Sequence, residues 1–152
     1  MIGLIWNCRG AFKKGFSTFL KDLMDEYKVD YICLQETMRK KYNDKIFRTI
    51  DSQKNFNWHW IPSKGKSGGM LSGIKMERFD VDSFENSDHI IIANIFDKKL
   101  NKHLSLANVY GPAQEKHKDL FLCELANMCS KCKYPILIGG DFNILQFSEV
   151  KN

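Results

Sequence analysis

The chain has 152 residues, of which 43% are hydrophobic and 27% are charged, and its formal net charge is +5. A chain of this length and composition is expected to be one globular domain, residues 1–152, and to be too short for two. No apolar run approaches the roughly 18 residues of a membrane span, and the first residues lack the basic flank and cleavage pattern of a signal peptide. We therefore predict an intracellular protein with no membrane partner, and the positive charge fits an anionic partner such as nucleic acid.

The N-terminal part of the chain predicts a strand, a helix and a second strand. Residues 1–6 form a short apolar run, and Asn7 follows it. Apolar side chains then recur at helical spacing over residues 16–27. Residues 30–35 predict a buried strand with Glu36 at its end. A strand–helix–strand unit places its two strands in parallel, so Asn7 and Glu36 should lie side by side.

The middle of the chain predicts several further strands between two helical segments. Ser17 or Thr18 is expected to cap the first helix, and a short helix is expected within residues 37–55. The predicted strands cover residues 56–61, 69–75, 79–85, 89–96 and 103–110. A helix is predicted over residues 113–132.

One stretch near the C-terminus, YPILIGGDFN, combines a strand with polar residues. The apolar run 136–138 predicts a short buried strand. Gly139 and Gly140 mark a place where something approaches the backbone closely. Asp141 and Asn143 are two residues apart and share one face if the chain stays extended. A carboxylate and an amide placed in this way suit work on a phosphate or a metal, but an Asx-type turn that closes the strand would use the same residues.

Polar residues follow four of the predicted strands. They are Asn7, Glu36, Tyr110, and Asp141 with Asn143. Each of them alone could be a cap or half-buried packing. Sites in sheet-based α/β domains gather at the carboxyl ends of strands, so we expect the five side chains to converge on one cleft.

Five short motifs contain these residues, and together they resemble one family. The motifs are WNCRG at 6–10, LQET at 34–37, SGGM at 67–70, NVYGP at 108–112 and IGGDFN at 138–143. In this order and spacing they resemble the endonuclease/exonuclease/phosphatase superfamily. Their wording most resembles the endonuclease domain of LINE-type (non-LTR) retrotransposons common in plant genomes, from Ile2 to about Glu149. The resemblance implies an α/β, DNase I-like fold, a two-sheet sandwich flanked by helices, and a nuclear enzyme that hydrolyses DNA phosphodiester bonds with a divalent metal.

The resemblance also implies a role for each of the five residues. Glu36 resembles the family's metal-binding Glu, and Asn7 the Asn that helps to hold the metal and the phosphate. Tyr110 resembles the Tyr near the phosphate. Asp141 resembles the Asp that orients or deprotonates the attacking water, and Asn143 the Asn that polarises the phosphate. Oxygen ligands of this kind suit Mg²⁺ or Mn²⁺.

The sequence departs from the family in one motif. The family has a later strand that carries Ser-Asp-His with a catalytic His, and this chain ends before it. We therefore expect a fold that is incomplete at its C-terminus, from a truncated gene model or a degenerate copy, with uncovered apolar faces around residues 136–141 and at most trace activity. Ser87, Asp88 and His89 lie between two earlier motifs and are not the equivalent, so His89 is expected to start a strand away from the cleft.

Two basic segments are candidate contacts to a nucleic-acid backbone. Lys64 and Lys66 lie in a predicted hairpin loop, and Arg39 and Lys40 closely follow Glu36. Basic runs of this kind are also common on ordinary solvated faces. Two other functions stay open: an apurinic-site repair nuclease or a lipid or nucleotide phosphatase of the same superfamily, and a non-catalytic remnant that binds nucleic acid.

The five cysteines are expected to be reduced and to have no disulfide partner. Cys129 and Cys132 form a C-x-x-C. A zinc site would need further ligands at a matching spacing, whereas this pair lies in a strongly helical stretch. We therefore predict thiols that pack against a helix.

Overall fold

The computed structural model describes residues 1–144, and its elements follow the predicted order. The C-terminal end of the family resemblance, residues 145–149, lies outside the described residues. The expected helix over 113–132 is instead a 3-10 turn followed by a separate helix. The elements are β1 (Gly3–Asn7), α1 (Phe16–Tyr27), β2 (Tyr31–Gln35), α2 (Asp44–Arg48), β3 (Phe56–Ile61), β4 (Met70–Lys75), β5 (Phe79–Asn86), β6 (Ile90–Asp97), β7 (Lys102–Tyr110), the turn Glu115–His117, α3 (Lys118–Ser130) and β8 (Ile136–Asp141).

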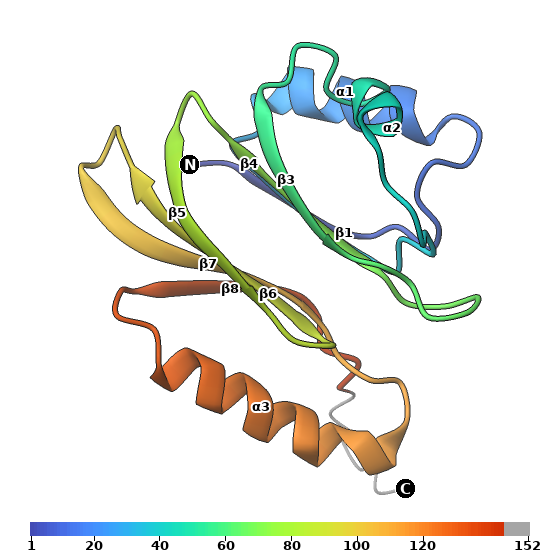
Figure 1. Cartoon of the computed structure of the whole chain (residues 1–152), viewed down its shortest axis with the longest axis vertical. Helices are drawn as coiled ribbons and strands as arrows, with labels where there is room; N and C mark the ends of the chain where they lie inside the picture. The colour runs from blue at the N-terminus through green and yellow to red at the C-terminus, as the bar shows by residue number, and fades with distance from the viewer. Residues whose placement is uncertain (145–152) are drawn as a thin grey trace, which may run out of the picture.

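The strands form two four-stranded sheets that pack face to face. Their orders are β1-β2-β4-β3 and β5-β6-β7-β8. β1 pairs with β2 in parallel, as predicted from the strand–helix–strand unit, and β7 pairs with β8 in parallel, while the other pairs are antiparallel. Helices α1 and α2 cover the outer face of the first sheet, and α3 covers the outer face of the second (Figure 1). The predicted two-sheet sandwich flanked by helices is confirmed.

Strand β2 shows how the layers are held together. Its residues are buried on both faces. Ile32 and Leu34 belong to the apolar cluster beneath α1, whereas Tyr31 and Cys33 belong to the cluster between the sheets. This alternation follows from the two-residue period of a strand. A third cluster lies between the second sheet and α3, with Cys129 and Cys132 packed against it; its buried members are Ile90, Ile92, Ala107, Val109, Phe121 and Leu125.

Helix α1 begins differently from the prediction. Its N-cap is Gly15, which adopts a left-handed conformation (φ 84°) and makes no side-chain capping bond. Neither Ser17 nor Thr18 caps it, and the Ser17 hydroxyl donates to Thr49 Oγ1 at 3.1 Å instead. The chain enters the helix through a tight turn that a glycine permits, so Ser17 and Thr18 lie two and three residues too late to cap it.

No helix among residues 1–144 has the length and apolar character that crossing a membrane requires.

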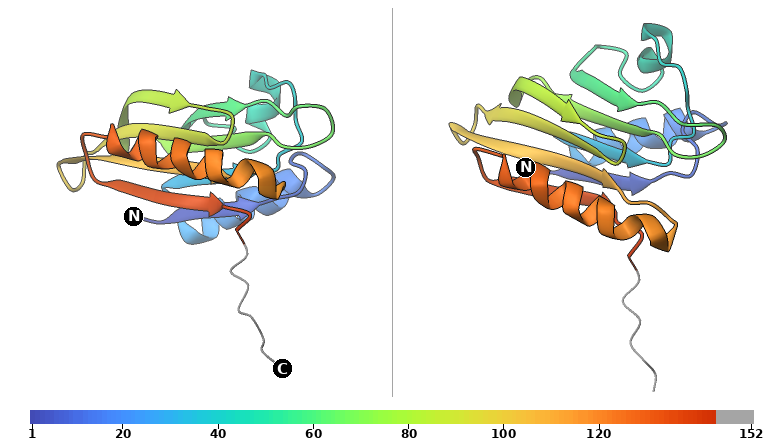
Figure 2. Two further views of the ribbon diagram at one scale, coloured as in Figure 1. Left: turned by 90° about the horizontal axis from the view of Figure 1, so that it is seen from below. Right: turned by 60° about the horizontal axis from the view of Figure 1, so that its bottom comes forward.

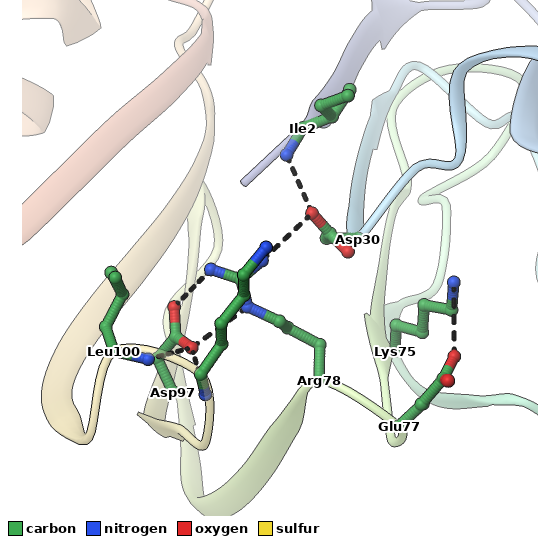
Figure 3. A network of polar contacts seen from close by, with 8 residues as sticks. Ile2, Asp30, Lys75, Glu77, Arg78, Asp97 and Leu100 are labelled. Atoms are coloured by element: carbon green, nitrogen blue, oxygen red, sulfur yellow. Dashed lines mark hydrogen bonds and ion pairs between the residues drawn. The ribbon is translucent and has the colours of Figure 1, made fainter.

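A buried ion pair joins the two sheets at the end opposite to the strand ends singled out above (Figure 3). Arg78, between β4 and β5, donates from Nε to Asp97 Oδ1 at 2.9 Å and from Nη2 to Asp97 Oδ2 at 2.8 Å. Arg78 Nη1 also lies 3.8 Å from Asp30 Oδ2, which accepts from the Ile2 backbone N–H at 2.8 Å. The hydrogen bonds from Arg78 are the main reason that the pKa of Asp97 falls to about 2.

Strand β8 is an edge strand, and this corrects the prediction of a buried one. β8 ends the second sheet and β1 ends the first, and these two edges lie side by side (Figure 2). Leu137 is 43% exposed, Ile138 36% and Ile5 43%. The expectation that apolar side chains around this strand stay uncovered is confirmed for the described residues. Uncovered apolar side chains on a free strand edge favour association with another polypeptide.

Candidate active site

The parallel strand pairs bring the predicted site residues together in space. In the first sheet Asn7 pairs in register with Gln35, the residue before Glu36. In the second sheet Tyr110 pairs with Asp141. The two sheets meet at these strand ends, where Asn7 Nδ2 donates to Asp141 Oδ2 at 2.7 Å. The strand ends of the two sheets are therefore in direct contact at Asn7 and Asp141.

Glu36 is held by loops from two other motifs. Its carbonyl accepts from the Gly10 backbone N–H at 2.7 Å, and the N–H of the next residue, Thr37, donates to the Gly69 carbonyl at 3.1 Å. Glu36 itself has a positive φ of 56°. A long side chain in this region costs about 1–3 kcal/mol and is kept where the surroundings fix it, commonly at a functional site. Backbone hydrogen bonds among the motifs WNCRG, LQET and SGGM thus hold the backbone of Glu36 in place.

Asp141 has hydrogen bonds to both of its carboxylate oxygens. Oδ2 accepts from Asn7, and Oδ1 accepts from the Asn143 backbone N–H at 3.0 Å. The Asx-type turn that the sequence left open is therefore present, and it coexists with the contact to Asn7. Asn143 has a φ of 50°, a conformation that Asn tolerates well, and its Nδ2 donates to the Gly111 carbonyl at 2.7 Å. The turn fixes the position of both polar side chains.

Gly139 and Gly140 allow the close approach that the sequence predicts, but the approaching group is the chain itself. A Cβ at Gly140 would collide with the Val109 carbonyl of the neighbouring strand, and its φ is 150°. A Cβ at Gly139 would collide with the Ile5 side chain of the other sheet. The glycines therefore let β8 pack against β7 and β1, and this packing carries Asp141 to Asn7.

Tyr110 pairs in register with Asp141 and lines one cavity together with Glu36. Burial raises its pKa above the ordinary value, and the negative charges of Glu36 and Asp141 raise it further. The phenol therefore keeps its proton at neutral pH and can donate a hydrogen bond.

The five residues line two adjoining cavities. Glu36 and Tyr110 line one of about 490 Å³. Asn7, Asp141 and Asn143 line the other, of about 600 Å³. The two cavities share a lining residue in the loop after β7. An extended ligand could therefore contact both groups of residues.

A family model supports the resemblance. The model of the endonuclease/exonuclease/phosphatase family matches residues 4–150. The chain belongs to this family. The match extends over residues 4–150, so it does not depend on any one of the five motifs.

Solved structures of family-like proteins share the fold. The human Nocturnin catalytic domain with bound sulfate anion is 16% identical with a TM-score of 0.69, and the match covers 93% of this chain and 64% of that one. A humanized D. rerio TDP2 is 14% identical with a TM-score of 0.66, at 95% and 63% coverage. A mannosyl-6-phosphatase of Bacteroides thetaiotaomicron is 12% identical with a TM-score of 0.66, at 95% and 66% coverage. The α/β, DNase I-like fold is therefore confirmed, over a chain that spans just under two thirds of these proteins, and no protein of curated function matches in sequence.

The residues at the strand ends fit a hard divalent cation. Asn7 Oδ1 is buried and has no hydrogen-bond partner among the described residues. This oxygen is left over because the amide nitrogen donates to Asp141, so the orientation of the amide is fixed. Within residues 1–144 no three His, Cys, Asp or Glu side chains gather as a metal cluster. Mg²⁺ does not need one, because it is commonly held by one or two carboxylates and keeps several waters.

The prediction that His89 lies away from the site is wrong. His89 lines the same cavity as Glu36 and Tyr110. It directly precedes β6, whose antiparallel pairing with β7 places it beside the end of β7. The Tyr110 backbone N–H donates to the His89 carbonyl at 2.9 Å. The order of motifs along the chain does not show that the start of one strand adjoins the end of its antiparallel neighbour.

A buried polar network behind the site was not predicted. Gln35 Nε2 donates to Asn108 Oδ1 at 2.7 Å, and Asn108 Nδ2 donates to the carbonyls of Leu34 and Leu71 and to Ser72 Oγ. Gln35 and Asn108 are each 1% exposed. The network joins the two sheets directly below the strand ends. Both residues lie inside family motifs, LQET and NVYGP, so an amide within an apolar strand was the available signal.

The four basic residues that were predicted to contact a nucleic-acid backbone differ in their position relative to the site. Lys64 lines the cavity of Glu36, and its Nζ lies 3.1 Å from Asp88 Oδ1. Lys40 and Lys66 are exposed. The Arg39 guanidinium stacks over an aromatic ring at 5.1 Å, so it is engaged within the protein. Lys64 is therefore the basic side chain best placed to meet a ligand in the cavity.

Proposed function

We propose that this chain is a single family domain that hydrolyses phosphodiester bonds in DNA with Mg²⁺ or Mn²⁺, a nuclear endonuclease of LINE-type retrotransposon origin. The observation that carries the proposal is the contact of Asn7 with Asp141 across the two sheets. It leaves the amide oxygen of Asn7 without a partner in the described part of the chain, and it holds the carboxylate of Asp141 against the same side chain. Metal-assisted hydrolysis needs both groups.

Glu36 and Asn7 are the residues that would hold the cation. Glu36 offers a carboxylate on a backbone that its neighbours hold in place, and Asn7 offers Oδ1, which has no hydrogen-bond partner within residues 1–144. When bound, the cation supplies positive charge that offsets the negative charge developing on the phosphate.

Asp141, Tyr110 and Asn143 would act on the water and the phosphate. Two donors fix the carboxylate of Asp141, and its remaining lone pairs can orient a water and accept its proton. The protonated hydroxyl of Tyr110 can donate to a phosphate oxygen. Asn143 uses one amide hydrogen on the Gly111 carbonyl, and its second remains for the phosphate.

The choice of DNA and of a retrotransposon origin rests on the sequence. The wording of WNCRG and NVYGP resembles that of LINE-type endonucleases, and a net charge of +5 favours a polyanion. Lys64 at the cavity supplies one backbone contact. Enzymes of the same superfamily that hydrolyse other phosphate esters would use the same five residues. The substrate therefore has to be decided by assay.

Nicking of supercoiled plasmid tests the proposal. The assay compares the wild-type chain with Asp141→Asn in Mg²⁺, in Mn²⁺ and in EDTA, because the amide keeps the shape of Asp141 but cannot accept a proton. We expect trace, metal-dependent nicking that Asp141→Asn abolishes. Residues 144–152 contain no Ser-Asp-His, and loss of one phosphate donor typically costs 10²–10³ in rate. A chimera extended by the C-terminal segment of a family member should nick faster and stay soluble.

Three results would contradict the proposal. Nicking that persists in EDTA, or that Asp141→Asn leaves unchanged, would assign the cleavage to another site or to a contaminant. DNA binding without metal-dependent cleavage, in the chain and in the chimera alike, would identify a non-catalytic remnant. Faster turnover of an apurinic-site duplex or of a phosphate monoester than of plasmid would assign the chain to the repair nucleases or to the phosphatases.

A further inference from the structure

His89 has a ring that is fixed by its neighbours. Its Nδ1 lies 2.9 Å from the Tyr110 carbonyl oxygen. Its ring packs edge-to-face on Phe121 of α3, with 5.6 Å between the ring centroids. The backbones of His89 and Tyr110 are also hydrogen-bonded to each other. Strand β7 and helix α3 therefore hold the imidazole in one orientation.

The contact with Tyr110 decides which ring nitrogen is available. A carbonyl oxygen can only accept a hydrogen bond, so Nδ1 of His89 carries a hydrogen and donates it. Among residues 1–144 no hydrogen bond reaches Nε2 of His89. The ring is partly exposed and lines the cavity of about 490 Å³ that Glu36 also lines. Nε2 is thus the ring atom left for a ligand.

The charged residues that line this cavity together with His89 are compatible with a bound anion. Asp88, the adjacent acid, is engaged by Lys64, whose Nζ lies 3.1 Å from Asp88 Oδ1. Lys64 and His117 line the same cavity as His89. Glu36, the other acid of that cavity, is the residue assigned to the cation. A phosphate held at that cation would bring its other oxygens into the cavity that His89 lines.

We propose that His89 binds a phosphate oxygen of the substrate through Nε2. The inference rests on the proposed function, because it uses the cation site of Glu36 to bring the phosphate into the cavity. Both ring nitrogens of a protonated histidine are donors, so Nδ1 keeps the Tyr110 carbonyl while Nε2 donates to the phosphate. Hydrogen bonds between charged partners are about twice as strong as neutral ones. His89 is then a substrate-contact residue that comes from the start of a strand.

Two variants separate contact with phosphate from a structural role. In His89→Asn the amide nitrogen takes the place of Nδ1, so the bond to the Tyr110 carbonyl is kept and the Nε2 position is lost. In His89→Gln the longer amide places a donor near the Nε2 position. His103→Asn is the matched control, because His103 pairs with Asp82 and lies outside the cavity.

The readout is NMR of ¹⁵N-histidine-labelled full chain, titrated with inorganic phosphate in the presence of Mg²⁺, together with plasmid nicking. In the wild type we expect the Nε2 signal of His89 to shift toward the protonated ring while Nδ1 stays protonated. Phosphate affinity should fall about tenfold in His89→Asn, partly recover in His89→Gln and stay unchanged in His103→Asn.

The outcomes distinguish this inference from the proposed function. Metal-dependent nicking with wild-type phosphate affinity in His89→Asn would overturn the inference and leave the function intact. Weakened phosphate binding in His89→Asn without any metal-dependent nicking would support the inference and count against the function. If His89→Asn fails to fold, the wild-type titration decides: an Nε2 signal that does not move at phosphate saturation overturns the inference.

Discussion

Replacing Arg78 by Met should destabilise the protein and remove part of the pH dependence of its stability. Arg78 makes two hydrogen bonds to Asp97 and lies close to Asp30, so it joins one sheet to the other. The side chains of Arg78 and Asp97 are 13% and 0% exposed. Met fills a similar length without charge, so the substitution tests the ion pair more than the packing.

The pKa of Asp97 gives the order of magnitude of the effect. The hydrogen bonds from Arg78 are the largest cause of the fall from 3.8 to about 2, and the backbone N–H groups of Leu100 and Lys99 also contribute. At 1.36 kcal/mol per pKa unit the whole shift corresponds to about 2 kcal/mol. Removing one partner of a buried ion pair typically costs roughly 3–5 kcal/mol, because the other charge stays buried. At pH 7 we therefore expect Arg78→Met to lower the free energy of unfolding by roughly 2 kcal/mol.

The pH dependence has a definite sign. The folded-state pKa of Asp97 is depressed, so the stabilisation is fully present above about pH 4 and is lost as the pH falls toward 2. Urea unfolding followed by tryptophan fluorescence, repeated between pH 7 and pH 2, measures both quantities. The difference between wild type and Arg78→Met should shrink over this interval.

A surface pair close by provides the control. Lys75 Nζ lies 3.5 Å from Glu77 Oε2, and the Glu77 side chain is 84% exposed (Figure 3). Glu77→Gln should change the free energy of unfolding by less than about 1 kcal/mol. A loss in Arg78→Met that is equally small, or that stays constant from pH 7 to pH 2, would refute the assignment of the stability to the ion pair.

Three further predictions concern the site and the free edge. Glu36→Ala should weaken Mg²⁺ binding far more than Lys66→Ala in a calorimetric titration, and equal effects would argue against a Glu36 ligand. Gly140→Ala should lower the free energy of unfolding, measured in urea, by roughly 1–3 kcal/mol or more, because the new Cβ would collide with the Val109 carbonyl. Wild-type stability of this variant would show that β8 and β7 can separate at little cost. Leu137→Lys should reduce the self-association of concentrated protein, measured by light scattering, without lowering stability. Unchanged scattering would show that the protein associates through another surface.

The sequence predicted most strands because their local patterns agree with the final fold. Residues 56–61 alternate and are bounded by turn residues, and they form β3 with the predicted limits. The strand-end residues were also predictable, because parallel neighbours finish together whatever the rest of the chain does. Asn7 and Gln35, the residue before Glu36, end the parallel neighbours β1 and β2 in register. The bond of Asn7 to Asp141 joins two different sheets, so the strand ends alone did not predict it.

The misses depend on contacts between elements that are distant in sequence. The run 136–138 is apolar enough for a buried strand, but its burial depends on a neighbour on its outer side, and none is present among residues 1–144. His89 was misplaced because strand pairing, not motif order, sets what adjoins Tyr110. Asn108 points between the sheets, and a periodicity of two does not show whether a buried amide will find partners there.

Paramagnetic Mn²⁺ tests the central claim, that Glu36 and Asn7 bind a cation where the strand ends of the two sheets meet. Added in small amounts to ¹⁵N-labelled protein, Mn²⁺ broadens the amide signals nearest to where it binds. We predict that the signals of Asn7, Glu36 and Asp141 broaden first and together, and that Glu36→Gln removes the effect. Broadening that begins elsewhere, or that Glu36→Gln leaves unchanged, would contradict the account.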